Sequence, residues 1–348
     1  MIIKEYGETN FITGLRFYAA TGVLLVHTGS VGLQGIFLGD RITELLAGGV
    51  FVFFVISGYS IAQSFTTSRS YARYFAKRLL RITPLYFFWL FFAIATNSTS
   101  EYWQTYFNQE IDLRNLIYHI TFLSAFEYEI TNSILGVEWS IPIEVFFYAL
   151  VPIFVFIAKR PRWFLISAGV VLASYLVFNR DPALLFANSL SPSLALNWSP
   201  VNYILSFLLG SAAFFLRELS GNFRSLKNTL LLVCLFLLFK FLENNSNILG
   251  HTYLLLTFLT FTFLIFFRPK NDFFQKILAN RFSLFGGSIS YGLYLSHFPI
   301  IRLLEDRFNL ESGSFLLFFL TFLFAILVST ITRLSIEMPI MRVASRFL

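Results

Sequence analysis

Charged residues are scarce in this chain. Only 13% of its 348 residues are Asp, Glu, Lys or Arg, whereas 56% are hydrophobic. Soluble domains usually carry about twice that share of charge. The single cysteine, Cys234, excludes an internal disulfide and a thiolate metal cluster. The sequence has no His and Glu spacing typical of a metal site, no glycine-rich phosphate loop and no Gly-x-Ser-x-Gly elbow. These absences argue against the common soluble enzyme frameworks and favour an all-α membrane protein without a metal centre.

Apolar runs of membrane-spanning length recur along the chain. Ten of them are candidate spans: 11–29, 44–65, 83–97, 138–158, 163–178, 201–217, 228–243, 251–267, 283–304 and 315–335. A weaker run at 114–126 is assigned to a loop, as an interfacial or re-entrant piece. The chain ends soon after the tenth run. We therefore expect one membrane domain over 1–348, a polytopic bundle of about ten transmembrane helices.

The distribution of positive charge predicts how this bundle is oriented. With the N-terminus in the cytoplasm, 20 of the 26 Lys and Arg residues fall in inner segments, whereas only 5 of the 19 acidic residues do. This bias is the one expected when both termini are cytoplasmic. The net charge of +7 is thereby explained by topology, and no nucleic-acid partner is expected. The outer loops 98–137 and 179–200 become candidate walls of an external pocket.

Arg16 and His27 stand within the first apolar run. Ionisable residues inside a membrane helix are costly to bury, so a functional site is the default hypothesis. Their spacing of eleven residues is about three helical turns, which places both side chains on one face roughly 16 Å apart. One helix face thus presents a cation near one membrane surface and an imidazole towards the other. This arrangement suits a long polyanionic molecule that reaches a base inside the membrane.

Five cations precede Pro84, which we expect to open the third span. Two of them, Arg78 and Arg81, are three residues apart and project together from a helix, as a phosphate-binding pair requires. The alternative is that these cations contact lipid headgroups under the positive-inside rule.

Two later spans carry further polar side chains. Ser140, Glu144 and Tyr148 repeat every fourth residue and share one helix face. Because Glu144 and His27 are predicted at similar depth, a His–Glu pair is geometrically possible, with the carboxylate orienting the imidazole as a general base. The alternative is a structural pair between helices.

The ninth span presents Tyr291, Tyr294 and His297 on one face. A lone histidine beside a proline is more often a core residue than a catalyst, so we assign His297 no catalytic role. Glu337, near the end of the chain, is expected to partner one of the inner arginines.

Six segments, taken together and in this order, resemble acyltransferase family 3, whose membrane proteins O-acylate bacterial cell-surface glycans and some small molecules. They are TGLRFYAATGVLLVH, FFVISGYSI, RLLRITPLYF, EWSIPIEVFFYALVP, SISYGLYLSHFP and IEMP. Thr13 and Phe51 stand where members often carry Asp, so no role of those acids is carried over. The soluble SGNH-type domain fused to some members is also not found in this chain.

The resemblance implies an enzyme of the bacterial plasma membrane that uses acetyl-CoA as donor. Arg16, Arg78 and Arg81 would hold the donor, and His27 with Glu144 would deprotonate a hydroxyl of a glycan or lipid-linked saccharide. The remaining polar residues of the matched motifs are expected to contact substrate: Trp139, Ser140, Tyr148, Tyr291, Tyr294 and His297.

Two other classes of protein share this composition. A transporter or flippase for a glycan or lipid would also be polytopic and basic inside, yet it needs neither an intramembrane His nor a phosphate-binding pair. The hypothesis that the chain is a structural membrane subunit gives no reason for the polar residues inside the spans. The sequence leaves open which acceptor and which acyl group are used, and it does not determine the oligomeric state. It also leaves open whether the acyl group is transferred directly or through an acyl-enzyme intermediate.

Overall fold

The computed structural model describes residues 9–33, 39–219, 224–242, 249–267 and 273–347, and all regular structure in these ranges is helical. Each of the ten predicted spans corresponds to a helix. These helices are α1 (Asn10–His27), α3 (Gly49–Thr67), α4 (Tyr71–Thr96), α7 (Ser140–Ala158), α8 (Pro161–Arg180), α11 (Ile204–Leu219), α12 (Arg224–Leu242), α13 (Leu249–Phe266), α15 (Arg281–Phe308) and α16 (Phe315–Thr332).

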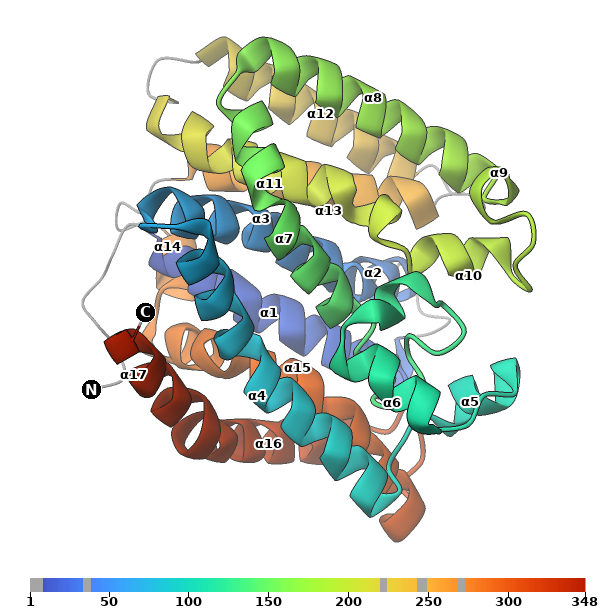
Figure 1. The fold of residues 1–348 in the computed structure, drawn as a ribbon. Coiled ribbons are helices and arrows are strands. Elements are labelled where there is room, and N and C mark those ends of the chain that lie inside the picture. The colour runs from blue at the N-terminus through green and yellow to red at the C-terminus, as the bar shows by residue number, and fades with distance from the viewer. Residues whose placement is uncertain (1–8, 34–38, 220–223, 243–248, 268–272, 348) are drawn as a thin grey trace.

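Shorter helices occupy the connections and the segment after α16. They are α2 (Gly39–Ala47), α5 (Glu101–Phe107), α6 (Leu113–Ile120), α9 (Ala183–Phe186), α10 (Pro192–Asn197), α14 (Phe273–Leu278) and α17 (Met338–Phe347). Single turns of 3-10 helix lie at Ser30–Gly32, Leu123–Phe126 and Pro200–Tyr203, and a π-helical turn lies at Arg333–Glu337. In Figure 1, α14 and α17 lie at one end of the bundle, whereas α2, α5, α6 and α10 lie towards the other. The weaker apolar run at 114–126 contains only the eight-residue α6 and one 3-10 turn, which is too short to cross a bilayer.

Within the described ranges, six helical segments are long and apolar enough to cross a membrane: Gly39–Thr67, Tyr71–Thr96, Ser140–Ala158, Pro161–Arg180, Pro200–Leu219 and Phe315–Arg346. Apolar stretches within α12 and α13 are shorter, at Lys227–Leu238 and Thr252–Phe266. The chain is therefore a multi-pass helical membrane protein by length and composition. The count of ten spans remains a prediction.

The start of α4 differs from the expectation. We expected Pro84 to open the helix, but α4 begins at Tyr71, and the side chain of Ser70 caps it by accepting the N–H of Arg73. Pro84 lies inside the helix. As a result Arg78 and Arg81 both stand on a continuous helix, one turn apart, as their spacing requires for joint binding.

The longest loop is folded rather than a solvated connector. Between α4 and α7, its polar side chains form a buried cluster in which Glu138 accepts the N–H groups of Ile134 at 2.7 Å and Val137 at 3.0 Å. His119 lies 3.5 Å from the Glu138 carboxylate, and both side chains are fully buried. Trp103 in α5 stacks on Trp198 with ring centroids 3.9 Å apart. These contacts attach the loop to the start of α7 and to the end of α10.

Glycines allow the central helices to approach closely, most clearly where α3 crosses α11. A Cβ on Gly58 would lie 2.4 Å from the carbonyl oxygen of Phe207, and one on Gly210 would lie 2.1 Å from that of Val55. Small residues at such crossings permit backbone contact, the main source of helix association in membranes.

We expect Gly210→Val to destabilise the protein by about 3 kcal/mol, because the added side chain must displace backbone atoms. The measurement is thermal unfolding of the full chain in detergent. Gly169→Val is the matched control, since a Cβ on this exposed α8 glycine meets no atom within 4 Å. Equal unfolding temperatures for the two variants would contradict the proposed helix contact.

Candidate active site

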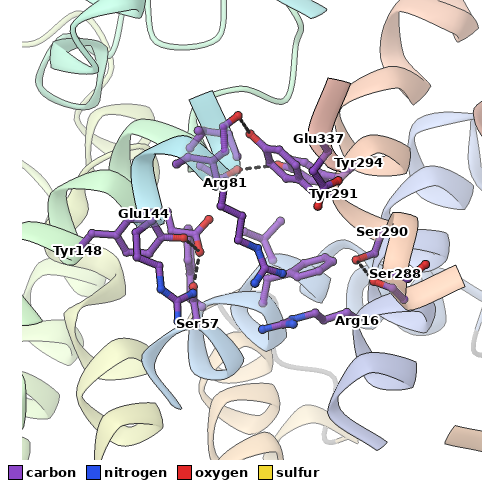
Figure 2. Close-up of a pocket in the computed structure, with 18 residues that line it drawn as sticks. Arg16, Ser57, Arg81, Glu144, Tyr148, Ser288, Ser290, Tyr291, Tyr294 and Glu337 are labelled. Atoms are coloured by element: carbon purple, nitrogen blue, oxygen red, sulfur yellow. Dashed lines mark hydrogen bonds between the residues drawn. The ribbon is translucent and has the colours of Figure 1, made fainter. Parts of the chain in front are cut away.

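A cavity of about 870 Å³, its open mouth included, lies between α1, α3, α4, α7, α15 and the π-helical turn. Figure 2 shows the polar side chains that surround it. The polar lining residues are Arg16, Ser57, Arg78, Arg81, Ser140, Glu144, Tyr148, Ser288, Ser290, Tyr291, Tyr294 and Glu337. Most of the site residues proposed from the sequence therefore meet in one place, although they come from four separate helices, α1, α4, α7 and α15.

Three guanidinium groups line this cavity. Arg16 donates to the Ser60 hydroxyl at 2.8 Å, and Arg78 donates to the Ser60 carbonyl oxygen at 2.6 Å. Arg81 points towards the same space as Arg16 (Figure 2). Ser60, which belongs to α3, therefore holds the guanidinium groups of both Arg16 and Arg78. Arg16 and Arg78 are half-buried and Arg81 is exposed at the mouth of the cavity. A cluster of three arginines is suited to a polyanion such as a phosphorylated ligand.

Glu144 lies in this cavity with the arginines. Its Oε1 accepts a hydrogen bond from Ser57 and another from Tyr148 at 2.8 Å (Figure 2). The guanidinium of Arg78 stands over the Tyr148 ring, 5.8 Å from its centroid. The sequence analysis missed Ser57, although it lies within the second of the family-like segments. Ser57 and Tyr148 hold the carboxylate at the wall of the cationic cavity.

His27 has a different partner from the one expected. Its Nδ1 lies 2.7 Å from Nε2 of His297, and the two imidazole rings are parallel within 5°. His297 is fully buried, and its Nδ1 lies 3.3 Å from the carbonyl oxygen of Leu293. The structure therefore replaces the expected His27–Glu144 pair with a His27–His297 pair.

The packing of α1 against α15 explains this pairing. A Cβ on Gly286 would lie 2.2 Å from the Phe17 ring, and one on Gly287 would lie 1.9 Å from the carbonyl oxygen of Thr13. Because these glycines let α15 lie directly on α1, His297 comes beside His27. Glu144 belongs to α7, which packs on α3, and α3 supplies its partner Ser57.

Tyr294 lies between the cavity and the histidine pair. It lines the cavity, and its ring centroid is 5.9 Å from that of His297. Its hydroxyl donates to the carbonyl oxygen of Val137 at 2.8 Å and lies 3.0 Å from Oγ of Ser140. The imidazoles are therefore one aromatic ring away from the arginine cavity.

Three other residues singled out from the sequence lie at or near the edge of the cavity. The Tyr291 hydroxyl donates to the carbonyl oxygen of Ile82 at 3.0 Å, at the cavity wall. Trp139 does not line the cavity. Its ring stacks on that of Trp198, with the ring centroids 5.7 Å apart. Glu337 forms the expected ion pair, with Arg333 at 3.6 Å, and also lines the cavity (Figure 2). The π-helical turn that contains both residues is a feature often found at functional sites.

Comparisons with known proteins identify a family for this chain. A family model described as "Acyltransferase domain" matches residues 9–334. The chain is similar to "Putative acetyltransferase ORF330" of Acidianus two-tailed virus, with 26% identity over 265 residues, or 74% of this chain and 73% of that protein. It is also similar to "Nodulation protein 10" of Rhizobium leguminosarum bv. viciae, with 27% identity over 180 residues, or 44% of this chain and 46% of that protein. No solved structure matches significantly.

The family match covers nearly the whole chain and includes α1, α4, α7 and α15, the helices that carry the arginines, Glu144 and the histidine pair. This assignment favours group transfer over the transport and structural alternatives. The chain belongs to acyltransferase family 3 and is an acyltransferase.

Proposed function

We propose that the enzyme transfers an acyl group, most simply acetyl, from acyl-CoA to a hydroxyl of a glycan or lipid-linked saccharide. The observation that carries this proposal is the position of the His27–His297 pair, one aromatic ring beyond a cavity with three arginines. The name of the viral relative supports acetyl as the group. No metal takes part in the proposed reaction.

In this proposal the arginine cavity binds the donor. Coenzyme A carries several phosphate charges, and the forked guanidinium groups of Arg16, Arg78 and Arg81 suit phosphate oxygens. The cavity also has an apolar wall that includes Phe53 and Ile141, as the pantetheine arm requires. The donor is cytosolic, so the arginine end faces the cytoplasm. The proposal also includes ten spans, both termini in the cytoplasm, and a location in the bacterial plasma membrane.

The hydrogen bonds of the histidine pair select which nitrogen acts as base. A backbone carbonyl only accepts, so Nδ1 of His297 carries the proton and donates to Leu293. Nε2 of the neutral His297 ring is then a lone-pair acceptor, and Nδ1–H of His27 donates to it. Nε2 of His27 is left with a free lone pair, which is the form a general base needs.

The proposed reaction is a direct transfer. Nε2 of His27 takes the proton of the acceptor hydroxyl while its oxygen attacks the thioester carbonyl. The C–S bond breaks, and the departing thiolate takes the proton back from the imidazolium, giving the ester and the free thiol. No protein nucleophile is required, and Glu144 with Ser57 and Tyr148 contributes to the donor cavity rather than to the base.

Acetyl transfer by the purified chain tests the proposed activity. We expect radiolabel to move from acetyl-CoA to a saccharide acceptor in the presence of wild-type protein. Mass spectrometry of surface glycan from cells with and without the protein identifies the natural product. Identical glycan from both cells, together with no turnover of acetyl-CoA in vitro, would refute the proposal.

We expect Arg78→Ala combined with Arg81→Ala to raise the KM for acetyl-CoA at least tenfold. Hydrogen bonds to charged groups contribute about 1.5–3 kcal/mol each, so the loss of either is measurable. Arg69→Ala is the control, because Arg69 is exposed outside the cavity on the same basic segment. An unchanged KM in the double variant would reassign the pair to lipid contact or topology.

A further inference from the structure

Arg302 lies beyond His27, away from the arginine cavity. Helices α1 and α15 run in the same direction, since Phe17 contacts Gly286 and His27 contacts His297. Arg302 follows His297 by five residues on α15, which places it about 7.5 Å further along the axis. It is one of the six cations that do not fit the positive-inside distribution. A cation in this position therefore needs an explanation other than topology.

The guanidinium of Arg302 forms no hydrogen bond or ion pair with any described residue, although its charge acts on Glu305 one turn further on. Its Nε is buried without a hydrogen-bond acceptor. A buried donor without an acceptor costs about 1–3 kcal/mol, so such groups are rare in native proteins. The missing acceptor is the feature that a bound anion would supply.

Packing sets the position of Arg302 relative to His27. The guanidinium carbon lies 5.7 Å from the centroid of the Phe298 ring, and that ring meets the His27 ring edge-on at 5.9 Å. The ring is confined on its other side by Gly136, which has φ of 76° and where a Cβ would lie 2.6 Å from it. One ring thus separates the cation from the base.

We propose that Arg302 binds an oxyanion of the acceptor, either the carboxylate of an acidic sugar or the phosphate of a lipid-linked saccharide. The assignment rests on the proposed function in one respect, that the acceptor approaches His27 from the side opposite the donor. An arginine stacked on an aromatic ring can present its two terminal NH2 groups for a planar, bidentate contact with carboxylate or phosphate. The enzyme then prefers anionic acceptors over neutral ones of the same shape.

Binding of three matched sugars to the full chain in nanodiscs tests this inference. The probes are methyl glucoside, methyl glucuronide and glucose 1-phosphate, with coenzyme A present to occupy the arginine cavity. We expect the Kd of at least one anionic sugar to be about tenfold below that of methyl glucoside, and Arg302→Gln to remove this preference. Arg307→Gln, an exposed cation on the same helix, should leave it unchanged.

Each outcome has a distinct meaning. A preference for glucuronide alone identifies an acidic sugar, and one for glucose 1-phosphate alone identifies a phosphate-linked acceptor. Equal affinity for all three sugars in the wild type, or a preference that survives Arg302→Gln, overturns the proposal. Because binding is measured without turnover, its failure is separate from that of the proposed reaction, which the transfer assay reports.

Discussion

Replacement of His27 by alanine is expected to lower kcat for acyl transfer at least about 10³-fold, because general-base catalysis commonly contributes 10²–10⁴-fold. His27 carries the free imidazole nitrogen in the proposed mechanism, and the described residues next to it offer no second base. His297 cannot substitute, since its Nδ1 is engaged by Leu293 and its Nε2 faces His27. The measurement is single-turnover transfer from labelled acetyl-CoA.

Two controls separate loss of chemistry from loss of the protein. His27 does not line the arginine cavity, so coenzyme A should still raise the unfolding temperature of the variant as it does for the wild type. The amount of variant in the membrane should also match the wild type. Transfer at the normal rate by a variant that passes both controls would rule out His27 as the base.

Replacement of His297 is expected to have the second-largest effect. His297→Leu removes the acceptor that holds Nδ1–H of His27, so the imidazole can rotate or adopt the tautomer with no lone pair at Nε2. We expect kcat to fall about 100-fold, within the range measured when the group that orients a catalytic histidine is removed. The KM for acetyl-CoA should change less than twofold, because the donor cavity is untouched.

His297→Gln distinguishes this positioning role from a purely structural one. A glutamine carbonyl oxygen can accept the Nδ1–H of His27, so this variant should recover at least tenfold over His297→Leu. Both substitutions remove the same ring, so a packing role would affect them alike. Equal activity of the Leu and Gln variants would therefore contradict the proposed tautomer control.

Most elements of the bundle could be predicted from local sequence. Each apolar run is long enough to form a helix, which satisfies the backbone hydrogen bonds within a single segment, as a bilayer requires. The spacing of Arg78 and Arg81 correctly placed both on one cavity, because residues three apart on a helix project together. The start of α4 was missed, because proline inside a membrane helix is tolerated when neighbouring groups compensate.

The candidate site could be predicted only in part. Arg16 and Glu144 were recognised as rare ionisable residues in apolar spans, and Arg78 and Arg81 by their spacing in a basic segment. The structure does bring the four together. Ser57 was not recognised, since a serine in an apolar helix has no distinctive pattern. Its importance lies in its contact with Glu144, 87 residues further along the chain.

The sequence by itself determined the helical membrane class, the family and most of the ionisable and aromatic residues from which the site is built, because composition, run length and motif order are local properties of the chain. Only the tertiary structure decided which of those residues meet. The His27–Glu144 hypothesis rested on predicted depth, and depth along two helices does not specify which helices are neighbours. Glycines at positions 286 and 287 bring α15 onto α1, so His297 becomes the partner of His27, while Glu144 is held by α3 in the arginine cavity.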